Sequence, residues 1–243
     1  YTTSMERMEA LADLAHRFQA PVFAHNSETE KEVRECIGRY GKTPTQVMDE
    51  LGLFDYGGGG YHCIWLGQED FEIFRRRGLF AVTCPGSNTK LASGIAPVAE
   101  FLRRGIPVAI GTDGAASNNC LDMFREMFLV TGLAKLREKD ASAVPAENVL
   151  RMATVNGARA MGLTGCETLS AGQKADLIMI DMDQPNMHPL SDPEKNLVYS
   201  GSKQNVCLTM IDGKILYECG KFYTAAEPGL IYEKAEEILH RIH

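Results

Sequence analysis

The chain has 243 residues, of which 25 are basic and 32 acidic, and its formal net charge is −7. Its 44% hydrophobic and 23% charged residues are typical of a soluble globular protein with one or two domains. The acidic balance argues against a nucleic-acid surface, and no apolar run approaches the roughly 18 residues of a membrane span. Seven cysteines without a CxxC pair indicate free thiols in a reducing cytoplasm.

Short apolar runs alternate with amphipathic stretches over the first 165 residues. The spacing predicts strands at 21–24, 61–66, 79–83 and 107–111. It predicts helices at 4–19, 28–40, 43–51, 68–77, 97–104, 122–137 and 145–161. The glycine run 57–60 is interpreted as a flexible loop before the second strand. Strands that alternate with helical crossovers indicate an α/β fold, with a parallel sheet and helices outside it.

The pattern changes after residue 165. Strand-like runs are predicted at 175–181, 206–211 and 214–218, with a charged helix at 231–242. The pair Asp212-Gly213 lies between two of these runs and is a hairpin turn signal. We therefore expect one domain over residues 1–165, and a small β-domain segment with a C-terminal helix over residues 166–243.

Side chains that can bind a metal or move a proton lie at the ends of the predicted strands. His25 and Glu28 follow the first strand, His62 lies at the start of the second, and Asp113 follows the fourth. The carboxyl ends of parallel strands share one rim, where α/β barrels place their active sites, so we expect these residues to converge. His and Asp suit a divalent metal such as zinc, and a carboxylate beside a metal-bound water suits acid–base catalysis.

Each of these residues also has an ordinary structural interpretation. Either histidine alone could be a hydrogen-bonded core residue, and Asp113 could cap a helix or form an Asx turn. Glu28 could be a first-turn carboxylate favoured by the helix dipole, which does not exclude catalysis. Such coincidences at several strand ends are less expected than one shared site. Cys63 and Cys84 fall near the same rim, but no base stands at the spacing that would activate a thiol.

The strings at these positions resemble the amidohydrolase superfamily, in its deaminase branch. They are similar, in order, to the motifs of barrel strands five to eight, the helix that follows and the start of the β-domain. The combination is closest to the 5-methylthioadenosine/S-adenosylhomocysteine deaminases and their chlorohydrolase-like relatives. The strings that carry the resemblance are residues 25–30, 61–63, 85–98, 111–119, 153–158 and 172–177.

The resemblance implies a fold and a reaction. Residues 1–165 would be the C-terminal half of a (β/α)8 metal-dependent hydrolase barrel, and residues 166–243 would belong to a small β-sandwich-like domain. The reaction would be hydrolytic deamination of S-adenosylhomocysteine, 5-methylthioadenosine or adenosine, with release of ammonia. The alternatives are another ring substrate (guanine, a pterin or an s-triazine) and a non-catalytic fragment.

The resemblance also implies a role for each site residue. His25 and Asp113 would be ligands of one divalent metal, zinc or alternatively iron. Asp113 would also take a proton from the metal-bound water, and Glu28 would carry that proton to the purine ring. His62 would orient the water and stabilise charge on the tetrahedral intermediate.

The sequence departs from the family pattern at two places. The family's strand seven opens with His-Asn-Pro, whereas this chain has Cys84-Pro85; Ser87 and Asn88, just beyond, would lie beside the substrate. The family's strand-one His-x-His pair, which supplies two further ligands, occurs nowhere in the chain. We therefore expect a closed barrel to require the missing N-terminal half or a second copy. The other expected partner is a small-molecule substrate, with no nucleic acid and no membrane.

Overall fold

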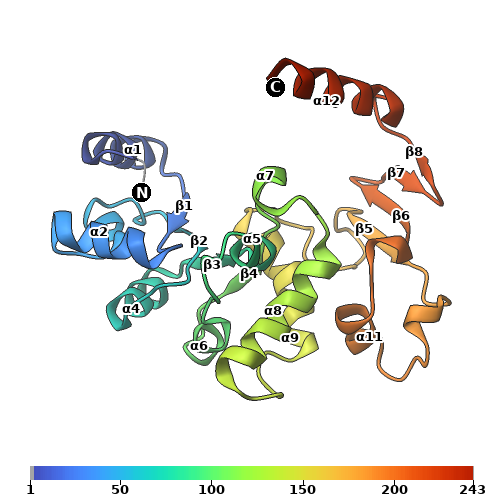
Figure 1. The fold of residues 1–243 in the computed structure, drawn as a ribbon, viewed down its shortest axis with the longest axis horizontal. Helices are drawn as coiled ribbons and strands as arrows, with labels where there is room; N and C mark the ends of the chain where they lie inside the picture. Colours follow the sequence, from blue (N-terminus) through green and yellow to red (C-terminus); the bar gives the residue numbers. More distant parts are fainter. Residues whose placement is uncertain (1–2, 243) are drawn as a thin grey trace.

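The computed structural model describes residues 3–242, in which four parallel strands form the first sheet (Figure 1). The strands are β1 (Val22–Asn26), β2 (Gly58–His62), β3 (Phe80–Thr83) and β4 (Val108–Ile110). They pair in the order β1-β2-β3-β4, which confirms the predicted parallel sheet. The connecting helices are α2 (Glu30–Tyr40), α3 (Pro44–Glu50), α4 (Gln68–Arg77), α5 (Pro85–Lys90) and α6 (Val98–Arg103).

A capping interaction decides where the first connecting helix begins. The Thr29 side chain accepts a hydrogen bond from the Glu32 backbone, and the Glu32 carboxylate accepts one from the Thr29 N–H, which is a capping box. Helix α2 therefore starts at Glu30, and the predicted start at residue 28 is wrong. Glu28 lies in the loop between β1 and the helix, so its side chain is not fixed by helical geometry.

The glycine run at residues 57–60 is the clearest correction to the sequence-based prediction. Strand β2 begins at Gly58 and ends at His62, so the run is largely strand and not a flexible loop. A Cβ on Gly58 would lie 1.9 Å from a backbone oxygen of β1, and one on Gly59 would lie 2.1 Å from a backbone oxygen of β3. Glycine is required because the two neighbouring backbones leave no room for a side chain.

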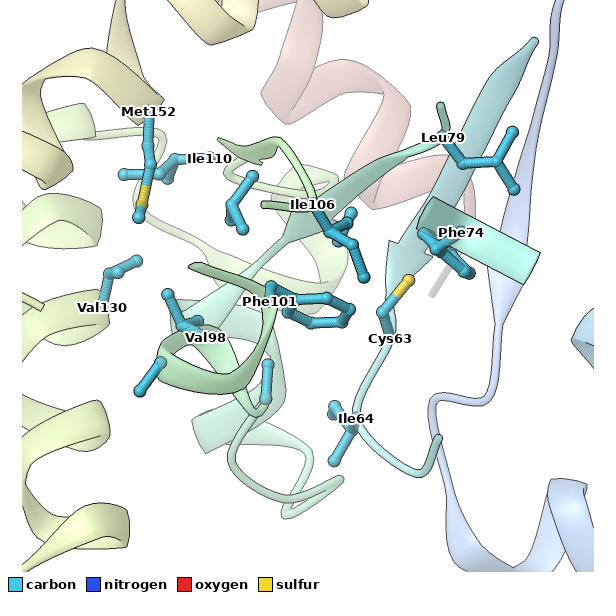
Figure 2. Packing of buried hydrophobic residues seen from close by; sticks show 14 of the residues in the cluster. Cys63, Ile64, Phe74, Leu79, Val98, Phe101, Ile106, Ile110, Val130 and Met152 are labelled. Carbon is cyan, nitrogen blue, oxygen red and sulfur yellow. The ribbon is translucent and has the colours of Figure 1, made fainter. Parts of the chain in front are cut away.

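Helices pack on the sheet and enclose one apolar core. Figure 2 shows Phe74 of α4 and Phe101 of α6 beside Cys63, which follows β2. Met152 of α9 (Ala146–Ala153) and Val130 of α8 (Met123–Glu138) lie on the other side of the core, where these two helices pack against β4. Full burial of each large apolar side chain contributes about 1.5–3 kcal/mol, so the core holds the strand ends firmly in place. Its largest fully buried apolar members include Phe54, Phe74, Phe101, Leu79, Ile106 and Met152.

The predicted helix at 145–161 is two helices in the structure. Helix α9 ends at Ala153, and α10 (Val155–Ala160) follows at once. Thr154 separates them with φ −121° and ψ −90°, outside the helical region. The apolar spacing continues through this break, which is why periodicity alone predicts a single helix.

The residues after 165 form a second sheet, which is antiparallel with the order β5-β6-β7-β8. Its strands are β5 (Leu177–Ile180), β6 (Val206–Ile211), β7 (Lys214–Glu218) and β8 (Lys221–Phe222). Asp212-Gly213 joins β6 to β7, as predicted. The two sheets lie on either side of residue 165, although the domain boundary itself stays a prediction.

Two more helices accompany the second sheet. Helix α11 (Pro193–Tyr199) packs against α8 and α9. Helix α12 (Pro228–Ile242) has no buried residue and lies apart from the helices around the first sheet (Figure 1). Among the residues that the structure describes, no helix combines the length and the apolarity needed to cross a bilayer.

Candidate active site

The parallel sheet carries the predicted site residues to one rim. His25 lies in β1, Glu28 follows that strand by two residues, His62 is the last residue of β2, and Asp113 follows β4. The register pairs His25 with Tyr61, one residue before His62. Glu28 and His62 are buried, Asp113 is half-buried and His25 is exposed.

Left-handed backbone conformations cluster at these strand ends. The φ angles are +53° at Ser27, +67° at His62, +51° at Cys63 and +60° at Asp113. Such a conformation costs a residue other than glycine about 1–3 kcal/mol, and it persists only where the surroundings impose it. The strain therefore indicates that the structure holds these strand ends in one particular arrangement.

The Glu28 carboxylate has two different contacts, one for each oxygen. Its Oε1 accepts a hydrogen bond of 3.0 Å from the Ser93 hydroxyl. Its Oε2 lies 3.8 Å from Nε2 of His62. The side chains of Glu28 and His62 are 7% and 2% exposed, so bulk water hardly reaches the space between them.

A hydrogen bond on the other side of the ring fixes the tautomer of His62. Its Nδ1 lies 2.7 Å from Oδ1 of Asn88. An amide oxygen only accepts hydrogen bonds, so Nδ1 carries the hydrogen. In the neutral ring, Nε2 then holds the lone pair and faces Glu28, and a proton gained there gives a cation beside the carboxylate. The ring also stacks on His25, with centroids 5.3 Å apart and planes at 22°.

Asp113 is held as a carboxylate. The Ser87 hydroxyl donates to its Oδ2 at 2.6 Å, and the Gly114 N–H donates to its Oδ1 at 2.7 Å. Burial opposes ionisation, but these two hydrogen bonds, with His62 and His25 nearby, hold the pKa of Asp113 below its usual value. Asp113 is therefore ionised at neutral pH, in the form that can bind a cation.

Ser87 and Asn88, predicted to lie beside the substrate, are 0% and 2% exposed. Their side chains contact Asp113 and His62, so their visible role is to hold those two residues, and substrate contact stays a prediction. Sequence reasoning missed Ser93, the partner of Glu28. The available signal was its position in the string at 85–98, which already contained the other two contact residues.

The ligand types at this rim suit a divalent metal, but among the described residues there are too few of them for a complete site. A His nitrogen at position 25 and an Asp oxygen at position 113 are ligands that zinc accepts, and zinc sites use three or more protein ligands. Within residues 3–242, however, no three His, Cys, Asp or Glu side chains come together closely enough to hold a metal ion. His25 and Asp113 thus provide part of a site at most, and their sharing of a cation stays a prediction.

Comparison with known proteins identifies the family of the chain. The family model described as "Amidohydrolase family" matches residues 1–216. A match over most of the sequence shows that the chain belongs to the amidohydrolase family. This membership confirms the resemblance read from the motifs at the strand ends.

Relatives and a solved structure show how much of the family fold is present. A 5-methylthioadenosine/S-adenosylhomocysteine deaminase of Caldanaerobacter subterraneus subsp. tengcongensis is 41% identical over 235 residues, covering 96% of this chain and 54% of the relative. A 5'-deoxyadenosine deaminase of Methanosarcina mazei is 41% identical over 245 residues, and the match covers 100% of this chain and 56% of the relative. A crystal structure of an adenosine deaminase from Xanthomonas campestris with bound zinc matches with a TM-score of 0.93 and 33% identity. The match covers 100% of this chain and 55% of the solved one.

The chain spans about half the length of the curated relatives it matches. The matches confirm the predicted fold class, in which the chain is the C-terminal part of a (β/α)8 amidohydrolase barrel with a small β-domain. The four parallel strands described above are therefore a part of that barrel.

Proposed function

We propose that this chain is part of a metal-dependent deaminase that removes the 6-amino group of an adenine-type nucleoside as ammonia. The observation that carries the proposal is the buried pair of Glu28 and His62, with Asp113 ionised at the same rim. The relatives named as 5-methylthioadenosine/S-adenosylhomocysteine and 5'-deoxyadenosine deaminases support the substrate class.

A divalent metal, held in part by His25 and Asp113, would when bound make water a usable nucleophile at neutral pH. Zinc is the metal this proposal favours, because the solved deaminase named above contains it. The remaining ligands would come from outside residues 3–242. The donor count within residues 3–242 supports this, and the absence of a His-x-His sequence is consistent with it.

Glu28 moves the protons in the proposed reaction. Water adds to C6 of the purine, ammonia leaves, and protons therefore pass from the water to ring atom N1 and to the amine. The Ser93 hydroxyl already occupies Oε1 of Glu28, so we assign proton transfer to Oε2. Asp113, the second carboxylate at the rim, takes the first proton from the water. Glu28 accepts that proton as a base and delivers it to N1 as an acid, and it then carries the second proton of the water to the leaving amine.

His62 stabilises charge in this scheme. Asn88 holds the ring through Nδ1, so Nε2 points towards the space beside Glu28. When the ring carries a second proton, the hydrogen on Nε2 can be donated to the oxygen that gains negative charge as water adds to the purine. A preorganised donor of this kind stabilises the transition state more than the substrate.

The open sheet supports the expected need for more polypeptide. β1 and β4 are edge strands in the described part of the chain, and a barrel of this type needs eight strands to close. A cavity of about 310 Å³ lies along β1, lined by apolar residues of α1 (Met5–Phe18) and α3 and by both charged and apolar residues of α2. We propose that the N-terminal half of the barrel, or a second copy, covers this edge.

The cysteines support the expected cellular location. All seven lie within the described residues and are free thiols. A reducing cytoplasm, where a small nucleoside substrate is also found, is the compartment this proposal assigns.

A substrate panel tests the function. The protein that contains this chain is loaded with zinc and assayed for ammonia release from adenosine, 5'-deoxyadenosine, 5-methylthioadenosine and S-adenosylhomocysteine. Guanine and an s-triazine are assayed beside them. We expect turnover of at least one adenine nucleoside, which a chelator abolishes and zinc restores. Turnover of guanine or the triazine alone would overturn the substrate class.

A further inference from the structure

One short segment contacts all three residues of the proposed catalytic machinery. We define the positioning segment as residues 85–93, which contain α5 and the turn after it. Its Ser87 holds Asp113, its Asn88 holds His62, and its Ser93 holds Glu28. These contacts measure 2.6, 2.7 and 3.0 Å in the same order. A displacement of the positioning segment would therefore disturb all three groups together.

Backbone hydrogen bonds make this segment a single unit. The Ser93 N–H donates to the Asn88 carbonyl at 2.9 Å, and the Leu91 N–H donates to the Ser87 carbonyl at 2.9 Å. The Trp65 indole donates to the Ser93 carbonyl at 2.8 Å and so holds the end of the segment. The beginning of the segment is held by a different group.

A buried carboxylate on α8 holds that beginning. Glu126 is 0% exposed, and its Oε2 accepts a hydrogen bond of 2.7 Å from the Gly86 N–H. Its Oε1 accepts one of 2.7 Å from Asn118, whose side chain also donates to the Thr112 carbonyl at 2.7 Å. One carboxylate thus joins the positioning segment to the loop that carries Asp113.

The fit around this carboxylate leaves no spare room. A Cβ on Gly86 would lie 2.3 Å from Oε1 of Glu126 and 2.7 Å from Nδ2 of Asn118. Burial raises the pKa of Glu126, although its contacts with Gly86 and Asn118 lower it. Burying a carboxyl group is unfavourable unless hydrogen bonds compensate for the lost water, so the structure depends on the contacts that Glu126 makes with Gly86 and Asn118.

We infer that Glu126 is a positioning residue of the proposed deamination, acting through Gly86 and Asn118 on the groups that hold His62 and Asp113. The inference rests on the proposed function for its catalytic meaning. The Glu126 carboxylate accepts its hydrogen bonds from Gly86 and Asn118, and not from a residue of the proposed catalytic machinery. Its effect on turnover must therefore pass through the positioning segment and the loop beside it.

Glu126→Gln is the variant that tests the inference, because it preserves size and removes one acceptor. A glutamine replaces one of the two accepting oxygens by an NH2 group, so either the Gly86 N–H or the Asn118 amide then faces a donor instead of an acceptor. We expect kcat to fall by about 10- to 100-fold, the usual effect of losing an outer-shell partner, while KM changes little. Gly86→Ala, which displaces the carboxylate without altering it, should reproduce the effect.

Thr131→Val is the matched control on the same helix. Thr131 is 0% exposed, and its hydroxyl donates to the Val144 carbonyl at 2.8 Å, away from the positioning segment. The control also removes a buried hydrogen bond from α8, so it should lower the unfolding free energy. We expect it to leave kcat unchanged.

Amide hydrogen exchange at Gly86 gives a second readout that does not depend on activity. In Glu126→Gln the Gly86 amide should exchange faster than in the wild-type protein, and in Thr131→Val it should not. The expected result is faster exchange at Gly86 together with a lower kcat in Glu126→Gln, and neither change in Thr131→Val. Unchanged exchange, unchanged kcat, or an equal loss of kcat in the control would each overturn the inference.

The two proposals can fail separately. A zinc-loaded wild-type protein that releases no ammonia from any adenine nucleoside would overturn the proposed function, and with it the catalytic role of Glu126. The exchange of Gly86 would still decide whether Glu126 holds the positioning segment.

Discussion

Nε2 of His62 lies 3.8 Å from Oε2 of Glu28, and the two side chains are 2% and 7% exposed. The opposite nitrogen of His62 is engaged by Asn88, and the other oxygen of Glu28 by Ser93. Nε2 of His62 and Oε2 of Glu28 therefore face each other across the same buried space. A base and a charge-stabilising donor held this way require little reorganisation before reaction.

The contact between Asn88 and His62 leads to the first prediction. Asn88→Ala leaves Nδ1 of His62 buried without its acceptor, so we expect the unfolding free energy to fall by about 1–3 kcal/mol. Turnover should fall as well, because the ring orientation is no longer fixed. Asn88→Asp keeps an acceptor oxygen and serves as the control. Urea unfolding and ammonia release measure the two effects, and an Ala variant equal to wild type in both would contradict the tautomer assignment.

The glycine strand gives a prediction about stability. A Cβ on Gly59 would lie 2.1 Å from the Phe80 carbonyl oxygen and 2.8 Å from the Phe23 ring. We expect Gly59→Ala to lower the unfolding free energy by at least about 1–3 kcal/mol, the usual cost of overpacking. Gly38→Ala is the control in helix α2, where an added Cβ meets nothing within 4 Å. It should be stabilising by roughly 0.5–1 kcal/mol, and similar unfolding midpoints for the two variants would show that β2 is wrongly assigned.

Thiol reactivity tests the environment behind the site. Burial, followed by the negative charges of Asp113 and Glu126, raises the pKa of Cys84 to about 12. Burial also raises the pKa of Cys63, whereas Cys219 is exposed. Iodoacetamide at pH 8 should therefore label Cys219 in the folded protein, and label Cys84 and Cys63 only after unfolding. Mass spectrometry of the peptides checks this, and rapid labelling of Cys84 in the folded protein would contradict the described packing.

The sequence predicts those elements whose pattern lies within a few neighbouring residues. The apolar runs near β1, β3 and β4 and the hairpin at Asp212-Gly213 are present in the structure, because burial and turn geometry act on neighbouring residues. Strand β2 was misplaced because glycines carry no hydrophobic pattern, and the backbone contacts that require them come from other strands. Helix α5 was not predicted because its sequence, PGSNTK, has no apolar periodicity.

The site was predictable only in part, for a related reason. Parallel topology brings His25, Glu28, His62 and Asp113 to one rim, and that could be inferred from strand order. The contacts that orient them join residues far apart in the chain. Ser93 and Glu28 are separated by 65 positions, and Glu126 and Gly86 by 40. Such contacts depend on packing of complete elements, which spacing within one element does not specify.

The central claim is that Glu28 carries protons in a hydrolytic deamination, and Glu28→Gln tests it most directly. Glutamine preserves the oxygen that accepts from Ser93 but cannot take up a proton. Turnover of the adenine nucleosides and metal content are measured in the same zinc-loaded samples of wild-type and variant protein. We predict a loss of at least about 100-fold in kcat, with the metal content unchanged. Turnover close to wild type in the metal-loaded variant would contradict the account.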